Sequence, residues 1–399
     1  TEAAEITQDE NSVRAKIVDL NTEEETEVET QFLIGADGPH SLVREVIGSV
    51  LETDPHPNYS QDVIFEADLS RYVEGRKAGL LYNATPDGVL VFQPLNGVTR
   101  WRCQIFSREP TVSPEEELVR RIRQAVGTDE PIPVEIVSTG LWQPTPGCVD
   151  KLRDGRIFLA GDAAHVAVPT GGMGNNTGFA GIRNLAWKIA FVLQGLAPAE
   201  ILDTYQAEHR PHALLRIAAG EATTRYMAGI FRAFYSGEDV APGVRATRQY
   251  ADHDGVLLGF ELGSELIRQE EEPPPKVDDP TIDFVPAVRC GRRAPHVWID
   301  EAAGRSVLDA FGWDYVLIAG NQTSTSVWAD TVANVASQTG FPLKFLELPE
   351  QNAESPWRND ELVLVRPDGI IADRWVEAGA EDMTARLGEF LPTAGRVLR

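Results

Sequence analysis

Residues 161–178 read GDAAHVAVPTGGMGNNTG, and this stretch decides the fold. The apolar segment Arg156–Ala160 before it predicts a short strand that ends at Gly161-Asp162. A carboxylate at the end of a strand can accept hydrogen bonds from a polyol, and the small residues after it leave room for a ligand chain. The glycine-rich part then leads into a helix expected from about Asn176 to Gly195, whose first N–H groups can stabilise an anionic ring system. A flexible surface loop is the alternative interpretation.

A second stretch, residues 32–44, reads FLIGADGPHSLVR. Its apolar strand ends in Asp37-Gly38, and Ser41 can cap a short helix that carries Arg44 in its first turn. Glycine lets the backbone approach a ligand closely, and a helix start offers free N–H groups and a positive dipole to a pyrophosphate. A plain turn between a strand and a helix is the equal alternative.

The region between these motifs alternates between strand and turn patterns. The acidic run Glu23–Glu29 is expected to turn the chain. A helix is expected to begin with Ser113 as its cap, Pro114 at its first position and Glu116 closing a capping box. Gly, Pro, Asn and Asp separate four candidate antiparallel strands: Val63–Leu69, Gly79–Tyr82, Val89–Gln93 and Trp101–Phe106.

A charged, proline-rich segment at residues 270–286 is the best domain boundary in the chain. Beyond it the pattern predicts a compact α/β unit. Its expected elements are the strand Tyr315–Ala319, the helix Ser326–Thr339, the strand Leu343–Leu348, the hairpin strands Leu362–Val365 and Ile370–Arg374, and the helix Met383–Leu391.

Composition excludes several classes of protein. With 399 residues, the chain is long enough for two or three domains. Its 61 acidic and 36 basic residues give a formal charge of −25, which repels nucleic acids and anionic membrane surfaces. The three cysteines are far apart in the sequence, so a disulfide framework and a zinc site are both disfavoured, and no metal is expected. The longest apolar stretch is too short to span a bilayer.

His165, His209 and His212 are interpreted as structural or surface residues rather than as catalytic or metal-binding ones. His165 has no base or metal ligand near it in the sequence. His209, Arg210 and His212 are expected to form a polar patch on a helix surface. The stripe Tyr226–Phe234 has helical spacing and is typical of a buried face.

The two motifs resemble those of the FAD-dependent aromatic hydroxylases, the group that includes para-hydroxybenzoate hydroxylase and phenol hydroxylase. The likeness is greatest to the polyketide hydroxylases of antibiotic pathways, which carry a loop of the type PTGGxGxNTG followed by NLAWK. Residues 169–178 and 184–188 match this pattern. The resemblance continues through residues 283–289 and 293–298, where that family enters a thioredoxin-like C-terminal domain.

The resemblance implies an α/β fold, in which a partial Rossmann-like FAD-binding domain is interleaved with a β-sheet substrate domain and followed by a thioredoxin-like domain. It also implies a cytoplasmic location and a possible homo-oligomer. The expected parts are the FAD-binding segments 1–60 and 141–200, the substrate sheet 61–140, the helical segment 201–270, the linker 271–283 and the thioredoxin-like domain 284–399.

The resemblance further implies a monooxygenase that uses NADPH (or NADH) and dioxygen to hydroxylate a phenolic or polyketide substrate through a flavin C4a-hydroperoxide. No side chain is assigned as a catalytic base. The residues implied at the cofactor are Asp162 at the ribityl chain, Pro169 beside the flavin, Gly171, Gly172, Gly174, Asn175 and Asn176 at the flavin ring edge, and Asp37, Gly38 and Arg44 at the pyrophosphate. The candidate substrate wall is Trp101, Cys103 and Ile105, with Met227 and Phe231 as weaker candidates.

Two departures from the family matter. No GxGxxG occurs in the chain, and the family carries about 100 further residues before the point that matches Thr1. We therefore interpret the chain as lacking that part, and we expect it to hold the ADP half of FAD poorly. Ala180-Gly181-Ile182 also stands where the family has Gln-Asp-Ala. A Baeyer–Villiger or epoxidising oxygenase and a non-catalytic homologue stay open as alternatives.

The C-terminal unit is expected to be redox-silent. Disulfide exchange needs an attacking thiol and a resolving partner, and Cys290 is the only cysteine of this region. A structural or oligomerisation role is therefore preferred for this unit.

Overall fold

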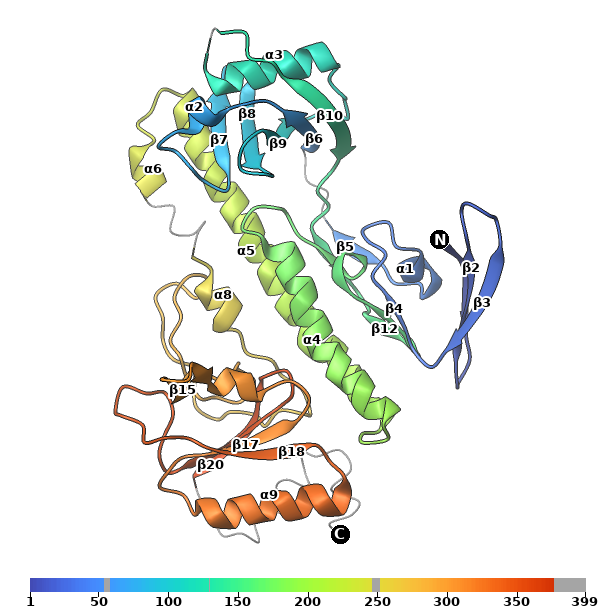
Figure 1. Cartoon of the computed structure of the whole chain (residues 1–399), viewed down its shortest axis with the longest axis vertical. Helices are drawn as coiled ribbons and strands as arrows, with labels where there is room; N and C mark the ends of the chain where they lie inside the picture. The colour runs from blue at the N-terminus through green and yellow to red at the C-terminus, as the bar shows by residue number, and fades with distance from the viewer. Residues whose placement is uncertain (54–57, 129, 246–251, 377–399) are drawn as a thin grey trace.

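Two long helices form the centre of this computed structural model, which describes residues 1–53, 58–128, 130–245 and 252–376. They are α4 (Met173–Leu193) and α5 (Thr204–Tyr235), joined by the 3-10 helix η2 (Ala199–Asp203), and they lie side by side (Figure 1). With 32 residues, α5 is about 48 Å long. It therefore reaches from the C-terminal domain to the upper sheet. In the described part of the chain, no helix is both long enough and apolar enough to cross a membrane.

The N-terminal strands pack beside this helix pair. The strand β4 (Leu33–Gly35) runs parallel to β13 (Ile157–Leu159), and the short helix α1 (Leu42–Val46) follows β4. The expected turn is confirmed only at the start of the acidic run, where Glu23 and Glu24 close a turn with Asp19. Residues 25–30 instead form the outer strand of an antiparallel sheet, and the side chains of Glu25–Glu29 are all exposed. The remaining elements of this region are β1 (Glu2–Gln8), β2 (Val13–Val18), β3 (Glu25–Thr30), β5 (Leu51–Thr53), β11 (Gly147–Val149), β12 (Arg153–Asp154), η1 (Gly161–Ala163) and β14 (His165–Val166).

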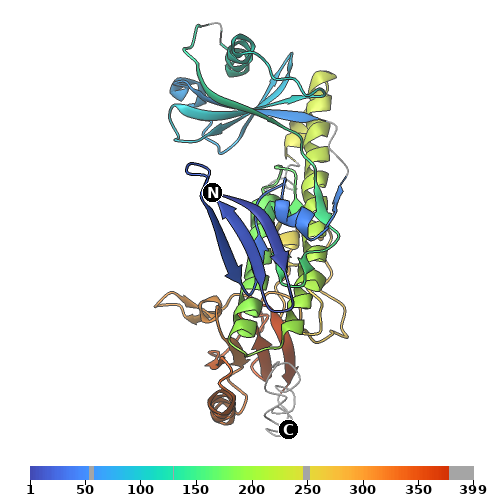
Figure 2. The ribbon, with the colours of Figure 1, turned by 90° about the vertical axis from the view of Figure 1, so that its right-hand side faces the viewer.

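The upper domain is a five-stranded antiparallel sheet in the order β10-β6-β9-β8-β7, which confirms the predicted hairpins. The helix α3 (Glu115–Val126) covers its outer face, and the other face is turned toward the rest of the molecule (Figures 1 and 2). The predicted cap of α3 is wrong: Pro114 is the N-cap, and the backbone N–H of Ser113 donates to Gln61 Oε1 instead. The other elements are β6 (Tyr59–Glu66), α2 (Ser70–Val73), β7 (Leu81–Thr85), β8 (Gly88–Pro94), β9 (Arg100–Ser107) and β10 (Glu135–Trp142).

The C-terminal domain contains a four-stranded sheet in the order β18-β17-β19-β20, with α9 (Thr325–Thr339) packed on it. Only β17 and β18 are parallel, because α9 connects them. The predicted helix Met383–Leu391 lies outside the described residues. The strands are β17 (Tyr315–Ala319), β18 (Leu343–Glu347), β19 (Glu361–Val365) and β20 (Ile371–Val376), and the smaller elements of this domain are β15 (Trp298–Asp300), β16 (Arg305–Ser306) and η3 (Val307–Ala310). Two short helices precede this domain in the sequence: α6 (Ala241–Arg245) lies beside the C-terminal part of α5, and α8 (Asp254–Leu258) also contacts α5.

The expected domain limits and the thioredoxin-like character of this unit stay predictions. Residues 260–270 nevertheless pack with the C-terminal sheet as well as with α5, where Phe260 stacks on His212 and Ser264 donates to Glu208. Ile267 lies in the apolar cluster of that sheet, and the Arg268 N–H donates to the Ala372 carbonyl. This short segment therefore fastens the C-terminal domain to the helix pair.

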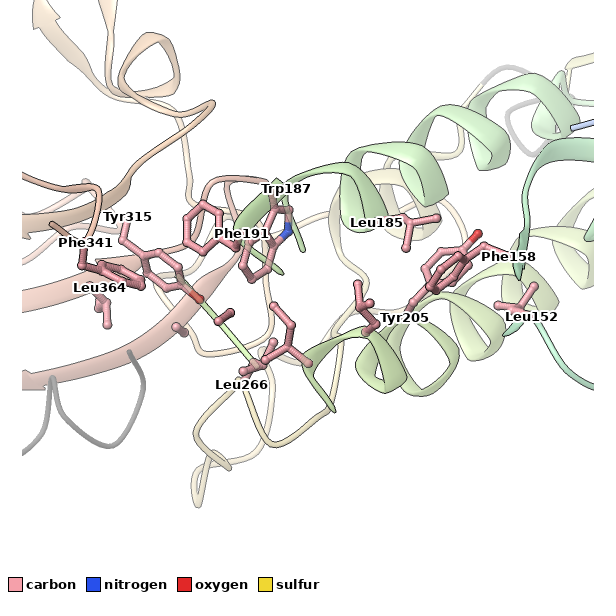
Figure 3. Packing of buried hydrophobic residues seen from close by; sticks show 14 of the residues in the cluster. Leu152, Phe158, Leu185, Trp187, Phe191, Tyr205, Leu266, Tyr315, Phe341 and Leu364 are labelled. Carbon is pink, nitrogen blue, oxygen red and sulfur yellow. The ribbon is translucent and has the colours of Figure 1, made fainter. Parts of the chain in front are cut away.

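A continuous apolar core joins the N-terminal strands, the helix pair and the C-terminal sheet (Figure 3). Phe158 on β13 packs on Tyr205 of α5, with ring centroids 6.4 Å apart. Further along, Trp187 meets Tyr315 edge to face, at 5.8 Å between centroids. The C-terminal domain is therefore packed onto the helices and is not merely tethered by the linker.

Buried charges reinforce this junction. Glu208 on α5 accepts hydrogen bonds from Arg366 at 2.7 and 2.8 Å and from Lys188 of α4 at 3.0 Å. Arg366 also binds Asp368, whose carboxylate accepts from the Trp187 indole N–H at 3.1 Å. Burial raises the pKa of Glu208, but the positive charges of Arg366 and Lys188 outweigh burial and hold that pKa far below its usual range. Every charge of this cluster is paired.

Candidate functional site

The two motifs singled out in the sequence lie together at the carboxyl ends of two parallel strands. Gly35 pairs with Leu159, and the Ala160 N–H donates to the Gly35 carbonyl at 2.9 Å. Arg44 of α1 reaches across and donates to the Ala163 carbonyl at 3.3 Å. The prediction that the strand after residue 155 ends at Gly161-Asp162 is thus confirmed, and the ends of both strands face one site.

Asp37 is engaged within its own turn. Its carboxylate accepts the Ser41 hydroxyl at 2.5 Å and the Val43 N–H at 3.1 Å, which fixes the start of α1. Ser41 caps this helix as predicted, accepting from the Arg44 N–H. Gly38 has φ +85° and open space where a Cβ would project, so a ligand can approach this backbone closely. A position of Asp37, Gly38 and Arg44 beside a pyrophosphate stays a prediction.

Asp162 stands at the carboxyl end of β13, in the short 3-10 turn η1. Unlike Asp37, its carboxylate makes no hydrogen bond or ion pair with the part of the chain that the structure describes. Burial raises the pKa of this carboxyl. The preceding Gly161 has φ +58° with open space beyond it. A half-buried carboxylate without a protein partner is available to accept hydrogen bonds from a ligand.

The glycine-rich loop delivers the start of α4 to the same place. Gly171 and Gly172 have φ values of +84° and +66°, which other residues rarely adopt, and Gly172 is the N-cap. No side chain caps this 21-residue helix, so its first N–H groups are free for a ligand. Asn176 turns back and donates to the Gly172 carbonyl at 2.8 Å, while Asn175 is exposed. The Asn176 side chain therefore positions the loop, whereas contact of Asn175, Gly174 and Pro169 with a cofactor stays a prediction.

His253 also supports this loop, and sequence reasoning missed it. A Cβ on Gly171 would lie 3.2 Å from the imidazole Cε1. His253 Nε2 is 3.2 Å from the Thr223 hydroxyl, which itself donates to the Ala219 carbonyl. Because the Thr223 hydroxyl uses its one hydrogen to donate to Ala219, it acts as the acceptor in its hydrogen bond with the His253 N–H. Burial lowers the pKa of His253, consistent with a neutral ring. No local sequence signal marks this residue, which follows Gly171 by 82 positions.

The expected surface patch of histidines is wrong. His209 and His212 are buried, because that face of α5 packs against α4 and the C-terminal domain. His209 Nε2 lies 3.1 Å from Nε2 of His165, so His165 has a partner that the sequence did not reveal. Burial lowers the pKa of His165 to about 4 and that of His209 well below its usual value. The pair is neutral and structural.

The expected substrate wall is also wrong. Trp101, Cys103 and Ile105 point into the apolar core beneath α3, where they pack with Leu118 and Ile122. The Trp101 indole donates to the Ala67 carbonyl at 3.2 Å within that core. The alternation of side chains along β9 correctly predicts that Trp101, Cys103 and Ile105 share one face of the sheet. It does not predict which face of the sheet a helix covers.

The open face of the sheet carries the alternate residues. Asp62 Oδ2 pairs with Arg102 at 2.6 Å, and the second Asp62 oxygen, Oδ1, is buried without a partner in the described chain. Ser60 Oγ and Gln104 Nε2 are likewise buried and unsatisfied among the described residues. Buried polar groups without partners are rare in proteins and mark a place for a ligand or water. Their signal in the sequence is the polar half of the alternating strands.

The C-terminal end of α5 borders this open face. The Phe231 ring packs on Tyr82 of β7 with 5.8 Å between centroids, and the Tyr235 hydroxyl donates to the Thr85 carbonyl at 2.8 Å. Met227 and Phe231 are half-buried rather than fully buried. The expectation that the stripe of α5 is a buried face is therefore wrong, while a role of Met227 and Phe231 near a substrate stays a prediction.

The comparison with protein families identifies the class. The FAD binding domain family matches residues 1–218, and the aromatic-ring hydroxylase C-terminal family matches residues 287–394. The chain belongs to the FAD-dependent aromatic-ring hydroxylases, and it is an FAD-dependent monooxygenase by that membership. The resemblance drawn from the two motifs is confirmed.

Individual relatives agree with this assignment. The 4-methyl-5-nitrocatechol 5-monooxygenase of Burkholderia sp is 32% identical over 98% of the chain and 73% of that protein. The tetracenomycin A2 monooxygenase-dioxygenase of Streptomyces glaucescens is 33% identical over 96% of the chain and 69% of that protein. The flavin-dependent monooxygenase PieE, solved with FAD and substrate, has a TM-score of 0.85 at 27% identity. The alignment includes 100% of this chain and 75% of the PieE chain. An aklavinone-11 hydroxylase with FAD and aklavinone has a TM-score of 0.78 at 29% identity, with 97% and 70% of the two chains aligned.

Proposed function

We propose that this chain holds the flavin end of FAD between Asp162 and the start of α4, and that it hydroxylates a polycyclic phenol held on the open face of the upper sheet. One observation carries the proposal. The free carboxylate of Asp162 and the uncapped N-terminus of α4 meet at the ends of the parallel strands, where the described chain supplies no partner for either.

These residues fit the chemistry of a flavin. The Asp162 carboxylate would accept hydrogen bonds from ribityl hydroxyls. The free N–H groups after Gly172 would favour negative charge on the ring edge, since a helix N-terminus carries a positive partial charge. When bound, FAD supplies the oxygen activation. The sequence holds no GxGxxG, so the described residues account for the flavin end of the cofactor only.

The substrate class follows from the open face of the sheet. Asp62 Oδ1 would accept a phenol O–H, and Arg102 beside it would favour partial negative charge on a neighbouring phenol or carbonyl oxygen. Ser60 and Gln104 would bind further oxygens. Electron donation from a phenol oxygen activates a ring toward oxygen transfer, so these groups would orient the ring and enrich it in electrons. The aromatic rings of Tyr82 and Phe231 supply an apolar border.

NADPH as electron donor, the oxygen-transfer step, a cytoplasmic location and a homo-oligomer stay predictions from the resemblance. The substrate names of the relatives, 4-methyl-5-nitrocatechol and aklavinone among them, describe those proteins. The polar face described above supports a polycyclic, multiply oxygenated ring in this one.

The proposal is tested by cofactor retention in the full-length protein. Asp162→Ala should purify folded but with most of its FAD lost, as judged by flavin absorbance per protein and by circular dichroism. Asp278→Ala, which removes an exposed carboxylate in the proline-rich segment, is the matched control and should retain FAD. Normal flavin occupancy in Asp162→Ala would remove this residue from the site.

A further inference from the structure

A cavity of about 280 Å³ lies between the helix pair and the C-terminal domain. One wall is formed by α4 at Ala180–Asn184 and by α5 at His209–Arg216, and the opposite wall by the segment after α8 and the turn at Asp368–Ile370. The cavity is more than one helical turn away from Gly172 along α4, so it is separate from the proposed flavin site. Its size is at the small end of ligand pockets, which typically measure about 300–1,000 Å³.

The inner end of this cavity carries an unpaired cation. Arg216 is only 5% exposed, yet its Nε and Nη1 atoms have no hydrogen-bond partner in the described part of the chain. Burial without a carboxylate partner lowers the pKa of Arg216 to about 10. Beside it, His212 Nε2 is also buried and without a partner among the described residues. Buried arginines are almost always paired, so this one indicates a missing anion.

Two more arginines stand at the mouth of the cavity. Arg183 of α4 and Arg293 make no salt bridge with the residues that the structure describes, and burial followed by the charge of Arg183 lowers the pKa of Arg293. The carboxylate in the lining is Asp368, which is already bound by Arg366 and the Trp187 indole. Three guanidinium groups therefore converge on a space that offers them no free carboxylate.

Most of the remaining lining is apolar. The α4 residues in the lining are Ala180, Arg183 and Asn184, and Ala180 is the smallest of them. Phe260 stacks on His212 with ring centroids 4.1 Å apart, and Leu257 and Phe311 complete an apolar wall. A ligand that fits would carry an oxyanion at one end and a small apolar body at the other.

We propose that this cavity binds a small organic oxyanion, a carboxylate or a phosphate ester, through Arg216 at its inner end and Arg183 and Arg293 at its mouth. The site is also connected to the flavin loop. His209 lines the cavity and bonds His165, which lies three residues after Asp162. A ligand here would therefore contact the support of the flavin loop without contacting the flavin.

The experiment measures anion binding to FAD-loaded full-length protein by isothermal titration, with benzoate as the carboxylate probe and phenyl phosphate as the phosphate ester probe. Sodium chloride at equal ionic strength controls for screening. We expect saturable binding of at least one probe, which identifies the preferred head group. Arg216→Met should weaken that binding about tenfold or more, and Arg216→Lys should weaken it less, because it keeps the charge but not the forked donors.

Arg225→Met, which removes an exposed arginine of the same helix, should bind as the wild type does. Arg216→Met should also leave the apoprotein folded and at least as stable as the wild type, because it removes an unpaired buried charge. No saturable binding of either probe would overturn the proposal. Binding that persists in Arg216→Met but is lost in Arg102→Met would place the anion on the upper sheet and would overturn it equally.

Discussion

The two ends of helix α4 are both rich in polar groups, and they differ in one respect. Near its C-terminal end, Lys188 and Trp187 belong to a cluster in which every buried charge has a partner. At its N-terminal end, the N-cap Gly172 supplies no side chain, and the Asp162 carboxylate nearby is unpaired in the described chain. The paired end holds domains together, whereas the unpaired end is available to a ligand. Whether the buried polar groups have hydrogen-bond partners, rather than how many there are, thus distinguishes the structural end of α4 from the ligand-binding end.

The largest effect is expected at the paired end. Glu208→Gln leaves Arg366 and Lys188 buried without their counter-charge, which should cost about 3–5 kcal/mol of unfolding free energy. Urea unfolding followed by tryptophan fluorescence measures this loss. Glu200→Gln, at an exposed position of η2, should change stability by less than about 0.5 kcal/mol.

This loss should depend on pH in a defined direction. The pKa of Glu208 in the folded protein lies below the ordinary value of 4.5, so its contribution is present above that value and declines as the pH falls. The difference between wild type and Glu208→Gln should therefore shrink on acidification below pH 4.5. A difference that grows on acidification would show that Glu208 is not the paired anion described here.

An intermediate effect is expected where α4 and α5 cross. A Cβ on Gly181 would lie 2.5 Å from His209 Nε2, so Gly181→Ala should cost about 1–3 kcal/mol through overpacking. Gly229→Ala on α5 meets nothing within 4 Å and should stabilise the protein by up to about 1 kcal/mol. In a His209→Ala background, the cost of Gly181→Ala should largely vanish. An equal cost in both backgrounds would show that the imidazole is not what requires the glycine.

A smaller effect is expected on the open face of the sheet. In Asp62→Asn the amide oxygen would stay on Arg102, and the NH2 group would replace the free acceptor proposed for a phenol. KM for the aromatic substrate should therefore rise about fivefold to tenfold, the effect of one lost hydrogen bond. Asp87→Asn removes an ion pair with Arg120 on the α3 side of the same sheet and should leave KM unchanged. Steady-state kinetics of both variants with one substrate compare the two faces directly. Equal KM values in both variants would argue against substrate binding on the open face.

The smallest effect is expected in the C-terminal domain. Burial raises the pKa of the Cys290 thiol, and all three cysteines are free and buried. Cys290→Ser should therefore leave hydroxylation unchanged, and native protein should react with a thiol reagent only after unfolding. A thiol that reacts rapidly in the native protein and serves disulfide reduction would show that this domain is not redox-silent.

The sequence predicted those parts of the fold that are set by local patterns. The β17 strand, the hairpins of the upper sheet and the turn at Gly161-Asp162 follow from apolar alternation and glycine positions, so their prediction was accurate. Acidic residues 25–30 were misread because a solvent-exposed edge strand carries no apolar signal. The burial of His209 and His212 was missed since it depends on packing against α4 and the C-terminal domain, which a local sequence pattern does not show.

For the site, the sequence predicted the position of the glycine-rich loop but not which side chains of the neighbouring elements face it. Asp162 and the glycines could be named because strand-end carboxylates and helix starts have local signatures. Trp101 was assigned to the wrong face of its sheet, because only the tertiary position of α3 decides which face is covered. Asp62 was missed for the same reason, and His253 was missed because its contact with Gly171 joins positions that are far apart in the sequence.

A ligand role for Asp162 is tested most directly by the stability of the Asp162→Asn apoprotein, measured together with its FAD affinity. Burial raises the pKa of Asp162 in the folded state, so ionisation of this carboxylate opposes folding at neutral pH. Asp162→Asn should therefore stabilise the apoprotein at pH 7, and this gain should disappear as the pH falls below the pKa of Asp162. FAD affinity should fall in the same variant. An apoprotein that loses stability at pH 7, or one that binds FAD as tightly as the wild type, would contradict the claim that this unpaired carboxylate exists for the ligand.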